Sequence, residues 1–308
     1  MALCRTRSKA AMLALALGVL AGCSGTGGGD TGDPRTTPNP NEYGTGLRVT
    51  DLVGPAVWLS PGNMMSAGCA VPADRSAYMT GQVIVGVDKY DETGAGQTGN
   101  IYVEDFPTTE APKPYSGITI FAPSFSPPDL RLFEGDLVDS FGTFSEFIGP
   151  SSGPFGDCKT LPEFNGTLTF RFEDATPEPL TIVKDGASNE RFAPIKGYEN
   201  ARQWLGMLVR IEGVTLTKGP VCSGGSPSCP SKDCTQCPEG WLGRYSADID
   251  VGGGVAVGDI VGISNELMDV KTEMPAIAAG TKFKAVTGIF TYFYGFKIAP
   301  RSVADFEL

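Results

Sequence analysis

Short apolar runs separated by turn residues dominate the body of the chain. Several runs alternate apolar and polar residues with a period of two, as strands with one buried face do, and TLTFRF at 167–172 is the clearest case. The 41 glycines and 24 prolines favour many turns between the runs. No long helical period follows the N-terminal segment, and only 200–205 is expected to form a short helical turn. The pattern predicts an all-β protein, with first-half strands at 81–87, 101–105, 118–121, 136–147 and 167–172.

The second half repeats this logic, with strands expected at 206–217, 247–249, 259–263 and 283–290. A Gly-Asp step precedes an apolar run at Gly135-Asp136 and again at Gly258-Asp259. In both places we expect the Asp side chain to bond the backbone of its own turn. A further echo links Gly142-Thr143-Phe144 to Thr287-Gly288-Ile289-Phe290. The two halves do not align without gaps, so the pattern indicates a weak internal similarity and does not demonstrate a repeat.

These motifs resemble bacterial OB-fold-like domains, which occur beside secreted nucleases or as tandem copies in lipoproteins. The matching segments are 206–213, Gly258-Asp259-Ile260-Val261, Val286-Thr287-Gly288-Ile289-Phe290 and Tyr294-Gly295-Phe296-Lys297-Ile298. The resemblance implies two small OB-like Greek-key barrels in tandem. Their glycines suit such barrels because closure of a five-stranded barrel requires bulges and sharp coiling.

The resemblance also divides the chain. It covers roughly 78–182 and 199–308, so we expect a first OB-like module at 46–198, with an N-terminal extension. A second module is expected at 199–308, with a Cys-rich loop at 222–237. No nuclease-like catalytic domain accompanies the barrels, which argues against a nuclease.

The first 22 residues have the layout of a secretory signal. Arg5, Arg7 and Lys9 form a positive start, and residues 10–20 are uncharged and mainly apolar. This stretch is too short for a membrane-spanning helix, which needs roughly 20 residues. It leads into Leu20-Ala21-Gly22-Cys23, which resembles the lipobox of bacterial lipoprotein precursors. The resemblance implies cleavage before Cys23 and lipidation of the Cys23 sulfur.

Residues 23–45 are expected to form a disordered tether behind the lipid. No aromatic or aliphatic residue occurs from Ser24 to Glu42, so this segment cannot bury enough apolar surface to order itself. Acyl chains contribute about 0.8 kcal/mol per buried methylene, and two or three of them anchor a protein almost permanently. Ser24, where Asp would favour retention at the inner membrane, indicates the outer membrane. We therefore expect a cell-envelope protein that is held at the membrane by its N-terminal lipid.

Charge and composition exclude several classes of activity. The chain carries a net charge of −11, and an acidic surface repels phosphate backbones, so nucleic acid is not an expected partner. The chain contains no histidine. Ser-His-Asp and Cys-His catalysis, His-ligated zinc hydrolysis and His-based nucleases are therefore excluded. We expect no cofactor and no bound metal.

Six cysteines remain once Cys4 leaves with the signal and Cys23 takes the lipid. An even number in an exported protein predicts three disulfides, although six cysteines allow 15 connectivities. The close spacing within 222–237 suggests two bridges there, which leaves a third in the first half. The alternatives are a four-thiolate zinc site and a redox Cys-x-x-Cys pair. The disulfide cysteines are expected to be Cys69, Cys158, Cys222, Cys229, Cys234 and Cys237.

Aromatic residues gather near the C-terminus, and Tyr292, Tyr294 and Phe296 are candidates for stacking on a ligand. Because Lys297 is the only basic residue in 285–300, a saccharide or an envelope protein suits them better than nucleic acid.

Paired carboxylates suggest a different chemistry, glycoside hydrolysis or calcium binding. Solvated strand edges and turns are the favoured explanation for them. The leading hypothesis is a non-catalytic binding or structural module of the envelope. The alternatives are a polysaccharide-acting enzyme or accessory, and a metal or redox protein that uses 222–237. The carboxylate pairs are Glu104/Asp105, Glu173/Asp174 and Asp248/Asp250.

Overall fold

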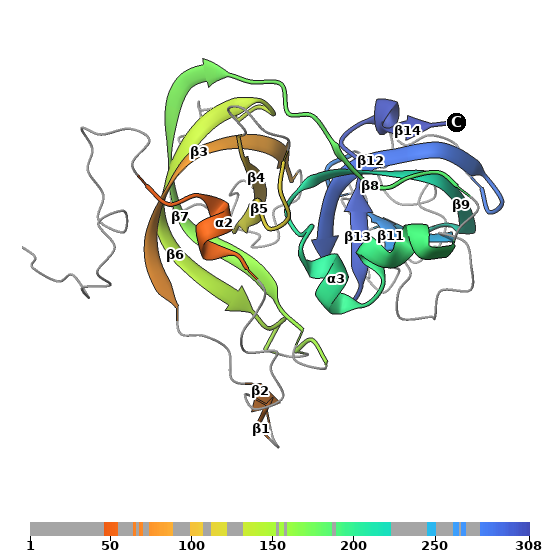
Figure 1. Cartoon of the computed structure of the whole chain (residues 1–308), viewed down its shortest axis with the longest axis horizontal. Coiled ribbons are helices and arrows are strands. Elements are labelled where there is room, and N and C mark those ends of the chain that lie inside the picture. The colour runs from red at the N-terminus through yellow and green to blue at the C-terminus, as the bar shows by residue number, and fades with distance from the viewer. Residues whose placement is uncertain are drawn as a thin grey trace, which may run out of the picture.

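The protein is all-β, with two five-stranded barrels, in a computed structural model (Figure 1). No helix among the residues that the structure describes is long and apolar enough to cross a membrane. The structure describes residues 46–54, 64–65, 68–69, 74–88, 99–106, 112–121, 132–151, 154–156, 159–186, 189–222, 245–250, 261–264, 266–268 and 278–308.

The first barrel closes in the order β3-β4-β5-β7-β6. All of its pairings are antiparallel except β5 with β7, which is parallel. Numbered along the chain, its strands therefore neighbour each other as 1-2-3-5-4-1, which makes it a Greek-key barrel. The strands are β3 (Arg75–Val87), β4 (Ile101–Asp105), β5 (Gly117–Ile120), β6 (Asp136–Phe147) and β7 (Leu161–Asp174).

The second barrel has the same connectivity. Its ring is β9-β10-β11-β13-β12, closed by pairing of β12 with β9, and only β11 with β13 is parallel. The edge strands β8 (Leu180–Val183) and β14 (Phe306–Glu307) extend this sheet. The tandem all-β prediction is confirmed. The ring strands are β9 (Leu208–Cys222), β10 (Tyr245–Asp250), β11 (Val261–Ser264), β12 (Lys282–Tyr292) and β13 (Phe296–Ala299).

The shared topology shows which of the similar sequence motifs occupy equivalent strands in the two barrels. Gly142 lies in β6 and Gly288 in β12, and both are the fourth strand of their barrel. The prediction that the two Gly-Asp motifs occupy equivalent positions was wrong. Gly135 precedes the fourth strand of the first barrel, whereas Gly258 precedes the third strand of the second barrel. At the first site the turn prediction is confirmed, since the Asp136 carboxylate accepts the Phe133 N–H at 2.9 Å.

The second unit begins earlier than the predicted boundary at residue 199. Strand β8 pairs in parallel with β9, and the 3₁₀ helix η4 (Asn189–Ile195) packs beside it and beside α3 (Tyr198–Arg202). The predicted helical turn at 200–205 corresponds to α3, which starts two residues sooner. A short helix α2 (Val49–Leu52) contacts the first barrel, and η6 (Val303–Asp305) precedes β14. A two-residue hairpin pairs β1 (Met64–Met65) with β2 (Gly68–Cys69).

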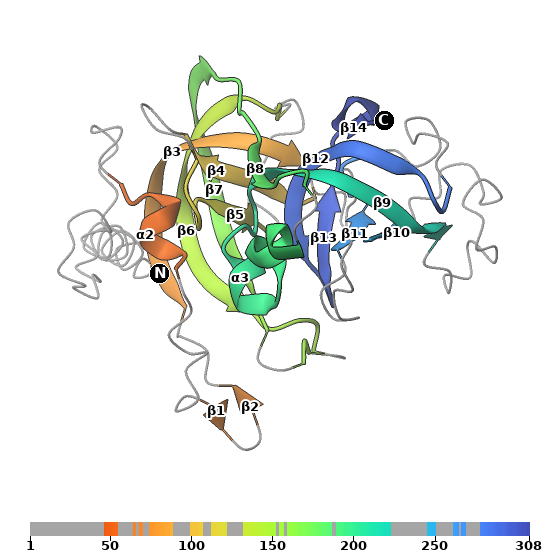
Figure 2. The same ribbon diagram turned by 45° about the vertical axis from the view of Figure 1, so that its right-hand side comes forward.

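The two barrels lie side by side with α3 at the seam between them (Figures 1 and 2). An apolar cluster joins them, in which Val83, Val85 and Tyr102 of the first barrel meet Leu208 and Ile289 of the second. Burial of this cluster gives the hydrophobic stabilisation that holds two such surfaces together.

The backbones approach closely at the same seam. A Cβ atom on Gly117 would lie 2.4 Å from the Gly206 carbonyl carbon, so only glycine fits there. Gly206 itself has a φ of 77°, which also favours glycine. The two barrels are therefore packed tightly against each other and form a single body.

Candidate functional site

A cavity of about 280 Å³ lies between the two barrels, and its lining is mainly apolar. The first barrel contributes residues from β4, from β7 and from the segments that follow β5 and β6. The second contributes the end of β12 and the turn after β11. The cavity thus exists only because the barrels are packed together.

Strand alternation explains the wall that the first barrel supplies. Ile101 and Val103 of β4 point into the barrel core, and Phe164 of β7 does the same. Because neighbouring residues of a strand face opposite sides, Tyr102 and Glu163 point outwards and line the cavity. Strands β4 and β5 are the second and third strands of the barrel, the face on which OB folds bind their ligands.

Tyr102 connects the two walls. Its hydroxyl donates to the Glu266 carboxylate at 3.0 Å and also hydrogen-bonds the Thr291 side chain. Burial raises the pKa of Tyr102 well above its usual value, and the carboxylates of Glu266 and Asp88 raise it further. The phenol therefore stays protonated and presents a polar group in an acidic wall.

Glu163 is the most unusual group in the cavity. Burial alone raises the pKa of its carboxyl to about 8, and no charged neighbour contributes. The residues opposite it on the flanking strands are Thr119 of β5 and Ser145 of β6, both uncharged. Among the described residues, the Glu163 side chain has no hydrogen-bond or ion-pair partner. The side chain is half-buried in the cavity wall, so this group can accept a partner from a ligand.

Aromatic rings form one rim of the cavity. Phe155 follows the first barrel's β6 and makes T-shaped contacts with Phe147, Tyr292, Phe293 and Tyr294, with centroids 5.1–5.8 Å apart. Three of these partners lie at or just after the end of β12, so Phe155 joins the two barrels through ring contacts.

Two of the three residues predicted to stack on a ligand are largely buried. Tyr292 and Phe296 are only 5% and 6% exposed, and both belong to the core of the second barrel. The Phe296 ring is stacked on the rings of Phe290 and Tyr198, which leaves no ring face for a ligand. Tyr294 is exposed, at 56%, and Tyr292 retains a place in the cavity lining. These two residues are buried because two-residue alternation continues to the end of β12 and the following turn returns Phe296 to the core.

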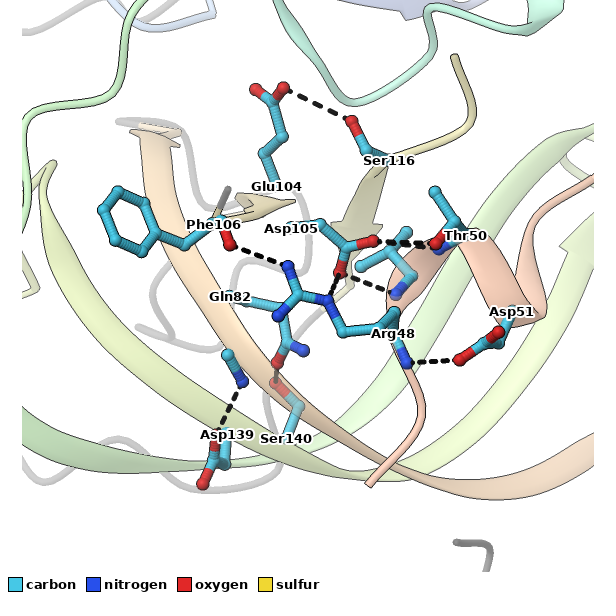
Figure 3. Close-up of polar contacts among 12 residues, drawn as sticks. Arg48, Thr50, Asp51, Gln82, Glu104, Asp105, Phe106, Ser116, Asp139 and Ser140 are labelled. Carbon is cyan, nitrogen blue, oxygen red and sulfur yellow. Dashed lines mark hydrogen bonds and ion pairs between the residues drawn. The ribbon is translucent and has the colours of Figure 1, made fainter. Parts of the chain in front are cut away.

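The Glu104/Asp105 pair is split between the two faces of β4, as Figure 3 shows. The Asp105 carboxylate accepts the N–H of Val49 at 2.8 Å and pairs with Arg48 at 3.3 Å, so it anchors α2 to the barrel. Glu104 instead accepts the Leu208 N–H of the second barrel at 3.2 Å and the Ser116 hydroxyl at 3.3 Å. The two groups cannot act together on one bond.

Burial raises the pKa of Glu104 to about 7, against the lowering effect of its two hydrogen bonds. Its position at the seam makes it a structural group. The side chains of the other two predicted carboxylate pairs lie outside the described residues.

Most predicted cysteine sites also lie outside the described residues. Cys69 is placed in β2 and Cys222 in β9, but their sulfur atoms are not described, and Cys23, Cys158, Cys229, Cys234 and Cys237 fall in undescribed segments. Lipidation and the three disulfides therefore stay predictions. Within the described part of the chain, no group of three or more His, Cys, Asp or Glu side chains is placed to hold a metal ion.

Sequence reasoning missed Tyr102, Glu163 and Glu266. Glu163 gave a weak signal, as a charged residue among apolar ones, but the strand containing it was predicted to begin only at 167. Glu266 meets Tyr102 across 164 residues of chain, and no local pattern indicates such a contact.

Comparison with known proteins supplies no family for this site: no family model, no curated protein and no solved structure matches the chain.

Proposed function

We propose that this protein is a non-catalytic, lipid-anchored protein of the cell envelope that binds a small ligand in the cavity between its barrels. The observation that carries the proposal is the position of the cavity. It lies on the β4–β5 face of the first barrel, where OB folds bind ligands, and the second barrel supplies its opposite wall.

The lining supports binding rather than turnover. Ligand sites are concave and mainly apolar, with a few polar groups that orient the ligand. Here the polar groups are Tyr102, Glu163, Glu266 and Thr291, set among aromatic and aliphatic side chains. The absence of histidine from the chain removes the commonest general base.

The lipid anchor rests on the lipobox and has its own test. Cells grown with labelled palmitate should incorporate label into the wild-type protein, and a Cys23→Ala variant should lose it. The label would move with the membrane fraction. A Cys4→Ala variant is the matched control and should keep the label, and label retained in Cys23→Ala would contradict the assignment.

Ligand binding is tested by blocking the cavity. Asn100 is half-buried at its edge, and we expect Asn100→Trp to abolish binding by filling the space. The lipidated protein in neutral detergent would be screened by ligand-observed NMR against neutral, anionic and cationic small molecules. Ser76→Trp, on the exposed part of β3, is the control for adding an indole. Binding to wild type and Ser76→Trp but not Asn100→Trp supports the proposal, and no binding to wild type by any compound contradicts it.

A second function is favoured by one observation. Glu163 and Glu266 line the same cavity, and burial holds Glu163 protonated to about pH 8, as a general acid in glycoside hydrolysis must be. Release of phenol from aryl glycosides by wild type, lost in Glu163→Gln, would establish this activity in place of simple binding.

A further inference from the structure

We propose that the cavity between the barrels binds a small organic cation, an ammonium group, and that Glu163 supplies the balancing charge. This inference rests on the proposed function, because it names the ligand class of the same cavity. It stands on three features of the lining: an unpartnered carboxyl, a second acidic group and aromatic walls.

The charges around the cavity are of one sign. Glu163 comes from β7, Glu266 from the turn after β11, and Asp88 acts on the same Tyr102 hydroxyl as Glu266. Among the described residues that line the cavity, none is Lys or Arg. The Lys297 ammonium lies 5.5 Å from the centre of the ring of Phe293, which lines the cavity. A cationic ligand is the partner that such a site would attract most strongly.

The aromatic walls add a second attraction. Phe121, Phe147, Tyr292 and Phe293 line the cavity, and ring faces attract ammonium groups by about 0.5–2 kcal/mol each when water is excluded. Lys297 already uses Phe293 in this way on the outside. A methylated or alkyl ammonium would contact the rings with its apolar part and Glu163 with its charge.

A metal ion and a neutral sugar fit less well. Metal ions need several oxygen, nitrogen or sulfur ligands, and the described residues provide no group of three or more suitable side chains. A sugar would offer hydroxyls to Glu163 but no positive charge to balance the acidic groups of the cavity wall.

The inference predicts that binding of a cation depends on pH. Burial raises the pKa of Glu163 to about 8, so the carboxyl is largely protonated at neutral pH and must lose its proton when the cation binds. The facing residues on β5 and β6 are uncharged. Across the cavity, Glu266 is bonded to Tyr102, whose own pKa is raised far above this range. Each pH unit below 8 lowers the ionised fraction tenfold, so affinity should fall up to about 100-fold from pH 9 to pH 6.

Choline and its uncharged carbon isostere, 3,3-dimethylbutan-1-ol, are the probes. Isothermal titration of the lipidated protein in non-ionic detergent should show choline binding at least tenfold more tightly than the isostere. Titrations at pH 7 in buffers of different ionisation enthalpy should show release of close to one proton per choline. Glu163→Gln should lose the preference for choline, its pH dependence and the proton release.

Glu178→Gln, an exposed site between β7 and β8, is the control and should behave as wild type. Thermal unfolding would show that Glu163→Gln is folded, and we expect it to be at least as stable, since it removes a desolvated carboxyl. Equal binding of both probes, or unchanged choline binding by Glu163→Gln, overturns the inference, as does the absence of choline binding. The screen with Asn100→Trp then decides separately whether the cavity binds a neutral ligand, so that the proposed function survives without the inference.

Discussion

Arg202→Ala should destabilise the protein by roughly 3–5 kcal/mol, because it leaves a buried carboxylate without its partner. The Arg202 side chain is 1% exposed and pairs at 2.6 Å with Glu146, which is 5% exposed. The Arg202 guanidinium also donates to the Thr160 hydroxyl at 3.1 Å and the Tyr198 hydroxyl at 3.2 Å. Urea unfolding of the non-reduced protein, followed by tryptophan fluorescence, measures the loss.

The network also joins the barrels, because Glu146 lies in β6 of the first and Arg202 in α3, which packs on the second. We therefore expect one cooperative transition in wild type, and Arg202→Ala to lower its midpoint rather than remove one barrel alone.

Two further variants make this test specific. Glu146→Leu with Arg202→Met replaces the pair by apolar groups of similar size and should recover at least half of the loss. Arg210→Ala breaks the more exposed pair with Glu307, which screening by water limits to about 1 kcal/mol or less. If Arg202→Ala and Arg210→Ala cost the same, the buried network does not have the stabilising role assigned to it.

The sequence predicted individual strands well because each strand carries its own alternating pattern. Residues 101–105 and 136–147 were predicted with the observed bounds of β4 and β6. Alternation along a strand and turn residues at its ends are local signals. The 1-2-3-5-4-1 order came only through resemblance, because no local signal specifies the parallel pairing of β5 with β7 or of β11 with β13.

The site could not be predicted because it belongs to the contact between barrels. Tyr102 and Glu163 look like ordinary outward-facing strand residues until the second barrel covers them. Phe155, outside every predicted strand, proves to be the centre of four ring contacts. Conversely, the aromatic cluster at the C-terminus looked accessible in the sequence, and packing placed most of it in the core. Tertiary contacts decide which face of a barrel is covered. The periodicity of the sequence carries no information about these contacts.

Glu104→Gln should change how stability depends on pH. Burial raises the pKa of Glu104 in the folded protein to about 7, against about 4.3 in an unfolded chain. The folded state therefore binds more protons between these values, and stability falls as pH rises from about 4 to above 7. The size of this contribution is roughly 3–4 kcal/mol, at 1.36 kcal/mol per unit of pKa shift.

In Glu104→Gln this contribution is absent, while the amide oxygen can still accept from the Leu208 N–H and the amide NH2 can donate to the Ser116 hydroxyl oxygen. The variant should therefore resemble wild type at about pH 4 and be the more stable protein at pH 8, by roughly 3–4 kcal/mol. Contributions of other carboxyls with raised pKa, Asp105 and Glu163, are present in both proteins and cancel in the difference. Urea titrations from pH 4 to 8 measure it, with Glu178→Gln as the control that should run parallel to wild type. A constant difference between Glu104→Gln and wild type across this range would mean that the pKa of Glu104 in the seam is close to its value in the unfolded chain, with its hydrogen bonds offsetting its burial.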